Sequence, residues 1–179
     1  KTETGVNALN DRLQSIVNPQ DGKKPEILYR NRIYRMGDKV MQTKNCEDVS
    51  NGDIGYITSI TTDDSDSMLT VDFGDGRVAE YDKSDLELLD LAYASTIHKS
   101  QGSEYKSVII NLQCAHAVML VRPLVYTAIT RAKERVIIVG ERRALCIAIR
   151  RTDTEQRGTK LAARIRSLAT ACDTRMLAN

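Results

Sequence analysis

The first part of the chain shows the apolar spacing of a helix, followed by a polar break. Apolar residues recur at helical intervals from Val6 to Val17, with Thr4 as the expected N-cap, until Asn18-Pro19 ends the run. This pattern predicts an amphipathic helix. The polar stretch at positions 20–26 contains glycine and proline, which predicts a loop of the kind that joins domains.

Between positions 27 and 89 the pattern changes to short runs of strand-forming residues. These runs lie at 40–43, 55–60, 68–73 and 77–81. The dipeptides Asn51-Gly52 and Asp75-Gly76 are strong turn signals between them. Short antiparallel strands at this spacing predict a compact barrel. A barrel of about sixty residues has a small core, so it should depend on a larger domain for stability.

From Asp90 onward, apolar strands alternate with helices. The expected strands are 91–97, 108–112 and 136–139, and the expected helices are 123–132, 143–150 and 160–168. Continuous apolar strands joined by a helix predict parallel neighbours that are buried on both faces. Because the first helix belongs with this α/β part, we predict one discontinuous α/β domain, 1–26 with 88–179, and an antiparallel β-barrel inserted at 27–87.

Composition constrains the function only weakly. The net charge of +2 is the difference between 26 basic and 24 acidic residues, so overall charge does not point to nucleic acid. Locally, positions 30–44 are basic, which could steer a polyanion to one face, although a solvated surface explains the cluster equally well. Aromatic residues make up 4% of the chain, which argues against a surface of stacking platforms for bases.

The cysteines and histidines indicate no special chemistry. The four cysteines are isolated in the sequence, which predicts reduced thiols in a cytoplasmic protein. With two histidines we expect no metal site. No apolar run approaches the ~20 residues of a membrane helix, and no basic-then-apolar signal is present, so we expect no membrane partner.

Two motifs carry the most specific information: Thr96-Ile-His-Lys-Ser-Gln-Gly-Ser-Glu104 and Val125-Tyr-Thr-Ala-Ile-Thr-Arg-Ala-Lys133. The first places side-chain donors beside a glycine at the end of an expected strand, where backbone N–H groups can meet phosphate. The second places Arg131 at the end of a short apolar helix, from which it can reach a phosphate bound elsewhere. The phosphate-loop pattern G-x-x-x-x-G-K-[ST] and a strand ending in Asp-Glu are both missing, so the chain alone should not hydrolyse a nucleoside triphosphate.

Together with the stretches 5–14, 35–42, 51–55 and 141–145, these motifs resemble the C-terminal motor domain of superfamily 1 DNA helicases. The resemblance is to the RecD-like branch, the alpha-subunit type of exodeoxyribonuclease V, and it weakens only over the last residues. It implies a second RecA-like domain with an inserted SH3-like barrel, working on single-stranded DNA with 5′-to-3′ movement. ATP and Mg²⁺ would be bound mainly by an N-terminal RecA-like domain of the same parent chain.

The resemblance also assigns roles to residues. Arg131 would be the catalytic arginine finger, although an arginine that ends a surface helix also interacts favourably with the helix dipole. Gly102 and Glu104 would face the nucleotide. The DNA-binding or coupling residues would be Thr96, His98, Lys99, Ser100, Gln101 and Thr127. Weaker DNA-binding candidates, which a solvated surface explains equally well, are Asn7, Asn10, Arg12, Arg35, Lys39 and Lys44.

Two other functions stay open at this point. In a non-enzymatic module, the barrel and the basic segment would bind DNA or a partner protein and the motor motifs would be vestigial. In a multi-subunit exodeoxyribonuclease, the same motor would work only with other nuclease subunits. A nucleotide loop upstream would favour a motor over a binding module, whereas nothing in the chain separates a solitary helicase from a nuclease subunit.

Overall fold

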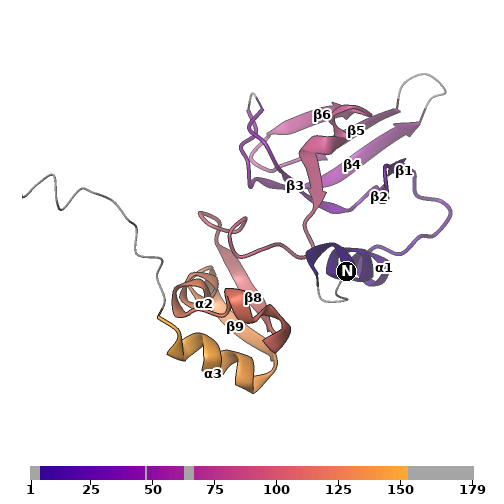
Figure 1. The fold of residues 1–179 in the computed structure, drawn as a ribbon. Helices are drawn as coiled ribbons and strands as arrows, with labels where there is room; N and C mark the ends of the chain where they lie inside the picture. The colour runs from indigo at the N-terminus through magenta and orange to yellow at the C-terminus, as the bar shows by residue number, and fades with distance from the viewer. Residues whose placement is uncertain (1–4, 47, 63–66, 153–179) are drawn as a thin grey trace, which may run out of the picture. The chain divides into compact units, whose positions relative to one another are not determined.

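The computed structural model describes residues 5–46, 48–62 and 67–152 (Figure 1). These residues form two compact units, one of the described residues up to Ile110 with Thr127–Ile138, the other of Asn111–Tyr126 with those from Val139 on. The elements are α1 (Val6–Val17), β1 (Glu26–Tyr29), β2 (Arg32–Arg35), β3 (Lys39–Gln42), β4 (Ile54–Thr62), β5 (Ser67–Asp72), β6 (Val78–Asp82), η1 (Asp85–Leu88), β7 (Leu89–Leu91), β8 (Tyr105–Leu112), η2 (Cys114–Met119), α2 (Arg122–Ile129), β9 (Ala132–Gly140) and α3 (Arg142–Arg150). No helix among the described residues has both the length and the apolar character to cross a membrane.

The predicted antiparallel strands are confirmed. Five of them form one sheet in the order β6-β5-β4-β3-β7, and β1 and β2 form a separate antiparallel hairpin (Figure 1). Both predicted turns are present, with Gly52 and Gly76 in the left-handed region at φ +97° and +77°. The hairpin and the sheet share one core, which is formed by Ile27, Tyr34, Val40, Val49, Ile57, Ile60, Leu69, Val71, Phe73, Tyr81, Leu86, Leu89 and Leu91.

One glycine is required where β4 passes β5. A Cβ atom on Gly55 would lie 2.6 Å from Val71 Cγ1 and 2.7 Å from the Asp72 carbonyl oxygen. Contacts this short with backbone and a packed side chain cannot be relieved by a rotamer change, so Gly55 permits the close approach of the two strands.

The predicted strand at 91–97 is wrong. Only Leu89–Leu91 is extended and paired, and this short β7 joins β3 in the barrel sheet, with Val40 opposite Leu91. Beyond it, the backbone of Ala94 pairs with a side chain in place of another strand. Asn10 Nδ2 donates to the Ala94 carbonyl at 2.9 Å, and the Ala94 N–H donates to Asn10 Oδ1 at 2.7 Å. A side-chain amide therefore takes the place of a sheet ladder.

The first helix is confirmed, but its most deeply buried side chains are amides, whereas the expected apolar residues Val6, Leu9 and Leu13 are only partly buried. The buried residues of the helix are Asn10 and Gln14, at 4% and 5% exposure, and its C-cap Asn18 is 5% exposed, whereas Ile16 and Val17 are 68% and 64% exposed. The N-cap is Gly5, and the expected Thr4 lies outside the described residues. The helix therefore packs through hydrogen bonds, because its neighbours present polar groups to this face.

In the α/β part, the described residues form one pair of strands, β8 and β9, with α2 between them in sequence. The Tyr105 N–H donates to the Arg131 carbonyl and the Glu141 N–H to the Leu112 carbonyl, so residue numbers rise in the same direction and the pair is parallel. The expected helix 123–132 ends earlier, at Ile129, because β9 begins at Ala132.

The expected burial of β9 is wrong. Its residues Val136, Ile137, Ile138 and Val139 are 37%, 42%, 41% and 51% exposed. Among the described residues β8 is the only strand that pairs with β9, so a strand with the composition of a sheet interior has little cover. The expected helix 160–168 lies outside the described residues.

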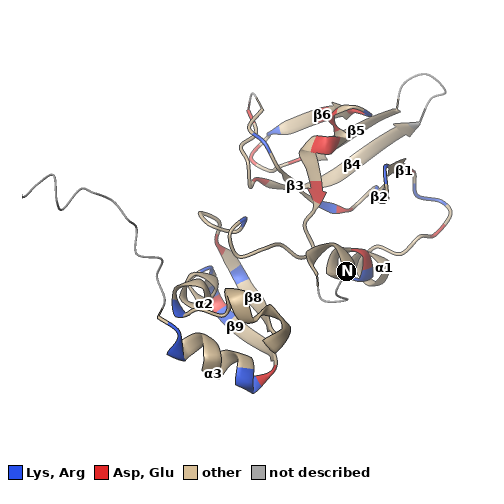
Figure 2. Ribbon diagram, in the orientation of Figure 1, with Lys and Arg blue, Asp and Glu red and all other residues tan. Residues whose placement is uncertain are grey.

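In the second unit, hydrogen bonds from two arginines join the helices to one another. The Arg122 N–H donates to the Arg151 carbonyl at 2.9 Å, and Arg122 Nε donates to the Ile149 carbonyl at 2.7 Å. Arg151 Nη1 donates to the Ala117 carbonyl at 2.6 Å. These bonds join the start of α2, the end of α3 and η2. The predicted helix at 143–150 is present as α3, with basic residues at both ends (Figure 2).

Candidate functional site

The first motif forms a compact turn after β7. The Lys99 N–H donates to Thr96 Oγ1 at 3.2 Å, and the Ser100 N–H donates to the Thr96 carbonyl at 3.2 Å. Ser100 is buried, and its hydroxyl donates to the Ile97 carbonyl at 2.8 Å. Thr96 and Ser100 thus build the turn itself. His98 and Gln101 are exposed, and their side chains make no hydrogen bond with any residue that the structure describes.

Lys99 is held by a carboxylate of the barrel. Its Nζ lies 2.6 Å from Asp90 Oδ2, and the other oxygen of Asp90 pairs with Arg32 Nη1 of β2. Partial burial acts to raise the pKa of Asp90, but the bonds from Lys99 and Arg32 outweigh it and leave the pKa below its ordinary value. Lys99 is therefore directed to an ionised partner, although its side chain remains 48% exposed.

Gly102 ends the turn in a conformation that favours glycine. Its φ is +88°, and an added Cβ would meet no atom within 4 Å. The requirement for glycine therefore comes from the backbone angle and not from crowding. The open space beside Gly102 also leaves its backbone accessible to a ligand.

Arg131 lies beside this turn. Its Nη1 donates to the Ser103 carbonyl at 3.3 Å, and its Nε donates to the Thr127 carbonyl at 3.2 Å. The third contact joins Nη2 to Thr130 Oγ1 at 3.3 Å. All three acceptors are neutral, and none of the described carboxylates lies within ion-pairing distance of the guanidinium. The side chain is thus fixed while its positive charge remains available to an anion.

The end of α2 explains why Arg131 takes this position. Thr127 lies one turn before it, so the guanidinium caps a carbonyl in the last turn of the helix, which also accepts from the Thr130 hydroxyl at 3.0 Å. A cation at a helix C-terminus is also stabilised by the helix dipole. The Tyr105 N–H donates to the Arg131 carbonyl at 2.8 Å, which joins the first residue of β8 to the same point.

Glu104 and Lys39 lie next to this junction. Glu104 Oε2 pairs with Lys133 Nζ at 3.1 Å, and both side chains are more than half exposed, so this pair contributes little stability. Lys39 Nζ lies 6.0 Å from the centre of the Tyr105 ring. Burial lowers the pKa of Lys39, which is half-buried and has no carboxylate partner among the described residues.

The remaining candidates are not gathered here. Arg35 is 9% exposed, with Nε 3.1 Å from Glu26 Oε2 and Nη1 donating to the Asn18 carbonyl at 3.1 Å, which gives it a structural role. Lys44 pairs with Glu87 at 3.4 Å on the exposed surface. Asn7 and Arg12 are exposed on α1, whereas Asn10 is buried against Ala94.

The sequence did not predict the residues that support the site by binding its motif residues. Asp90 and Arg32 fix Lys99, and neither stands in a motif. Asp38, which lies in the stretch 35–42, and Tyr93 belong to a network with α1 that the sequence did not predict. A signal for that network did exist, because Asn10, Gln14 and Asn18 recur every four residues and so share one helix face.

Two family models match the chain in succession. One, described as the ATP-dependent RecD-like DNA helicase SH3 domain, matches residues 9–73. The other, described as the UvrD-like helicase C-terminal domain, matches residues 91–139. The first match contains the barrel strands β1 to β5, and the second contains both site motifs.

Curated relatives extend the similarity over most of the chain. The ATP-dependent RecD2 DNA helicase of Deinococcus radiodurans is 40% identical over 169 residues, which cover 93% of this chain and 22% of that protein. The RecBCD enzyme subunit RecD of Mycobacterium tuberculosis is 30% identical over 164 residues, covering 88% of this chain and 26% of that protein. The chain therefore spans about a quarter of the length of these relatives.

A solved structure of Pif1 helicases, described as unwinding forked double-stranded DNA, shares the fold. Its TM-score is 0.50 with 21% sequence identity, over 76% of this chain and 37% of that chain. Similarity to RecD-type DNA helicases thus runs through both the barrel and the two site motifs.

Proposed function

We propose that this chain is the second RecA-like motor domain, with an inserted SH3-like barrel, of a RecD-type ATP-dependent DNA helicase that acts in the cytoplasm. The similarity to RecD2 and RecD proteins supports the helicase assignment. The parallel β8–β9 pair around α2 supports part of a RecA-like sheet, and we assign the insertion to residues 27–87, whose sheet is extended by β7 at Leu89–Leu91. The fragment by itself would not hydrolyse ATP.

The position of Arg131 is the observation that carries this proposal. Its guanidinium is fixed by neutral oxygen atoms beside the Gly102 turn and keeps an unneutralised charge. A fixed guanidinium stabilises the negative charge that develops on the transferred phosphoryl group without reorganising at the moment of reaction. We assign this role to Arg131, with Gly102 and Glu104 on the nucleotide side of the turn.

ATP and Mg²⁺ would be held mainly by the N-terminal RecA-like domain of the same parent chain. The residues present here fit a contributing role, because the open backbone at Gly102 and the neutral anchoring of Arg131 both suit a phosphate group. When bound, the metal ion would neutralise phosphate charge. Closure of the two domains would bring Arg131 to the nucleotide, and reopening after hydrolysis would move this domain along single-stranded DNA in the 5′-to-3′ direction.

The DNA side would use the exposed part of the same turn. His98 and Gln101 are exposed, and Lys99 is half-exposed with its charge only partly neutralised at Asp90. Such groups suit contacts with a phosphate backbone. Thr96, Ser100 and Thr127 would shape the turn and couple it to Arg131, and Lys39 would add a cation beside Tyr105.

The test is Arg131→Ala in the full-length parent protein. We expect nucleotide binding to persist while ATP turnover falls by about 10³-fold or more. Arg135→Ala is the matched control, because Arg135 is an exposed arginine of β9 and belongs to no described ion pair. Near-normal turnover in the Arg131 variant would remove the finger assignment. A wild-type parent protein without any ATPase activity would favour a non-enzymatic DNA- or protein-binding module.

The similarity to a RecBCD enzyme subunit supports a second candidate, the motor subunit of a multi-subunit exodeoxyribonuclease. The two candidates differ in their need for partners. Unwinding of forked DNA by the purified parent protein alone would support a solitary helicase. Activity that appears only after other nuclease subunits are added would support the complex.

A further inference from the structure

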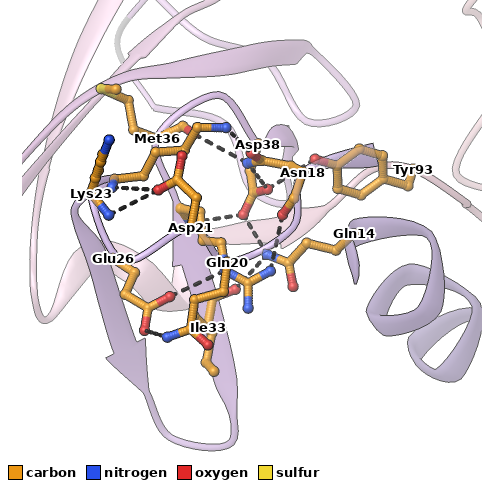
Figure 3. A network of polar contacts seen from close by, with 12 residues as sticks. Gln14, Asn18, Gln20, Asp21, Lys23, Glu26, Ile33, Met36, Asp38 and Tyr93 are labelled. Atoms are coloured by element: carbon orange, nitrogen blue, oxygen red, sulfur yellow. Dashed lines mark hydrogen bonds and ion pairs between the residues drawn. The ribbon is translucent and has the colours of Figure 1, made fainter. Parts of the chain in front are cut away.

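A buried carboxylate lies at the junction of α1, the barrel and the segment that leads into the site turn. Asp38 is fully buried and accepts four hydrogen bonds (Figure 3). Its Oδ2 accepts from Gln14 Nε2 at 2.5 Å and from the Arg35 N–H at 2.8 Å. Its Oδ1 accepts from Asn18 Nδ2 at 2.7 Å and from the Tyr93 hydroxyl at 2.9 Å.

Hydrogen bonds alone satisfy this charge. No lysine or arginine among the described residues lies within ion-pairing distance of Asp38. Burying an unpaired carboxylate is costly unless donors occupy its acceptor positions, which is the case here. Burial first, and then the neighbouring carboxylate of Asp38, raise the pKa of Tyr93, so its hydroxyl remains a donor at neutral pH.

On the barrel side, Asp38 is joined directly to two strands. It immediately precedes β3, and its carbonyl accepts from the Ile57 N–H of β4 at 2.9 Å. The adjacent Gly37 N–H donates to the Ile57 carbonyl at 2.8 Å. A displacement of β3 and β4 therefore moves the carboxylate.

On the site side, two successive residues are held by the same assembly. Tyr93 donates to Asp38. The backbone N–H and carbonyl of Ala94 both bond the side chain of Asn10, which lies one turn before Gln14 on α1. Thr96, which opens the site turn, follows two residues later. The barrel, α1 and the start of the turn are thus linked by short polar contacts, buried around Asp38 and partly buried at Tyr93 and Ala94.

We propose that Asn10, Asp38 and Tyr93 are positioning residues that transmit the placement of the barrel to the Thr96–Glu104 turn. DNA held by the barrel and the turn would then alter nucleotide turnover through this junction. The inference rests on the proposed helicase function. It goes beyond that function by naming a coupling route that contains none of the residues that would contact phosphate.

The experiment uses the full-length parent protein and single-stranded oligothymidylate. Tyr93→Phe removes the hydroxyl that donates to Asp38, and Asn10→Ala removes both hydrogen bonds to the backbone of Ala94. Tyr81→Phe is the matched control, because its buried hydroxyl donates to Gln42 Oε1 at 2.9 Å inside the barrel and does not touch the junction. For each variant, the thermal midpoint, the basal ATPase rate and the DNA-stimulated ATPase rate are measured.

We expect Tyr93→Phe and Asn10→Ala to reduce the ratio of stimulated to basal turnover by about 5-fold or more, the size of a typical coupling between sites. Tyr81→Phe should lower the thermal midpoint to a similar degree while retaining the wild-type ratio. If all three variants share the wild-type ratio, or if the control loses it equally, the inference is overturned. If Tyr93→Phe does not fold, the ratio of stimulated to basal turnover in Asn10→Ala tests the inference. A wild-type protein without DNA-stimulated ATPase would instead overturn the proposed function.

Discussion

The ion pair between Lys99 and Asp90 predicts that removing a carboxylate strengthens DNA binding. Lys99 Nζ lies 2.6 Å from Asp90 Oδ2. Under the proposed function, a DNA phosphate would therefore compete with Asp90 for this ammonium group. Asp90→Asn removes the competing charge and keeps the side-chain shape, so Lys99 becomes available to DNA at a lower cost.

The size of the effect follows from the exposure of the pair. Lys99 and Asp90 are 48% and 33% exposed, so the pair belongs to the class of partly exposed ion pairs worth about 0.2–1 kcal/mol. Releasing Lys99 should therefore tighten binding to single-stranded DNA by at most about 5-fold at low salt. If the freed lysine neutralises one phosphate, the slope of log K against log salt should steepen by about 0.7.

The assay is fluorescence anisotropy of a labelled oligothymidylate with the full-length parent protein, without nucleotide, across a salt series. A double-mutant cycle tests the route of the effect, because Asp90→Asn should change nothing once Lys99→Ala is present. The folded-state pKa of Asp90 is lowered, so its charge is present above its ordinary pKa of about 3.9 and is lost only as pH falls through the lower, folded value. The difference between variant and wild type should therefore not change between pH 6 and pH 8.

Two results would refute this reasoning. Unchanged or weaker DNA binding in Asp90→Asn, with an intact fold by circular dichroism, would show that Asp90 does not restrain Lys99. Tighter binding that persists in the Asp90→Asn, Lys99→Ala double variant would show that the effect arises from the release of Arg32, the other partner of Asp90, or from general negative charge, and not from Lys99.

Two further predictions concern the turn and the barrel. Gly102→Ala should lower the free energy of unfolding by about 1–2 kcal/mol because of its positive φ, and it should also impair DNA-stimulated ATPase activity. Gly22→Ala is the control, because Gly22 has φ +67° and also has no atom within 4 Å of an added Cβ. This variant should lose a similar amount of stability in urea unfolding and keep the wild-type ATPase activity. Lys39→Met should raise the thermal midpoint at pH 7, because burial lowers the pKa of Lys39 and disfavours its charged form. This gain should shrink as pH rises through the folded pKa toward the unfolded value of about 10.4, and an unchanged midpoint at pH 7 would contradict it.

The barrel was predictable because its signals are local. Asn51-Gly52 and Asp75-Gly76 require tight turns, and the residues between them favour strands. The segment 91–97 misled because its apolar residues suit a strand, whereas its backbone partner is the side chain of Asn10, far away in sequence. Such pairings depend on tertiary structure and cannot be predicted from a local sequence pattern.

The site was predictable only in part, for a related reason. The motifs identified the turn and Arg131 as parts of one region, and the structure places the guanidinium within 3.3 Å of the Ser103 carbonyl oxygen. Their supporting residues come from elsewhere, since Asp90 and Arg32 belong to the barrel strands. Hydrophobic periodicity also missed the amides that α1 buries, because a buried carboxylate selects amides as its neighbours.

The absence of a basic partner for Asp38 among the described residues has a practical consequence for solution conditions. Added electrolyte weakens attraction between exposed opposite charges, including contacts with a nucleic acid, but it has little effect on hydrogen bonds around a group that solvent cannot reach. Raising the ionic strength should therefore release DNA while leaving the anchorage of α1 intact. Under the proposed function, the protein would then release DNA with the barrel and the turn still held together, and it could bind another strand without refolding.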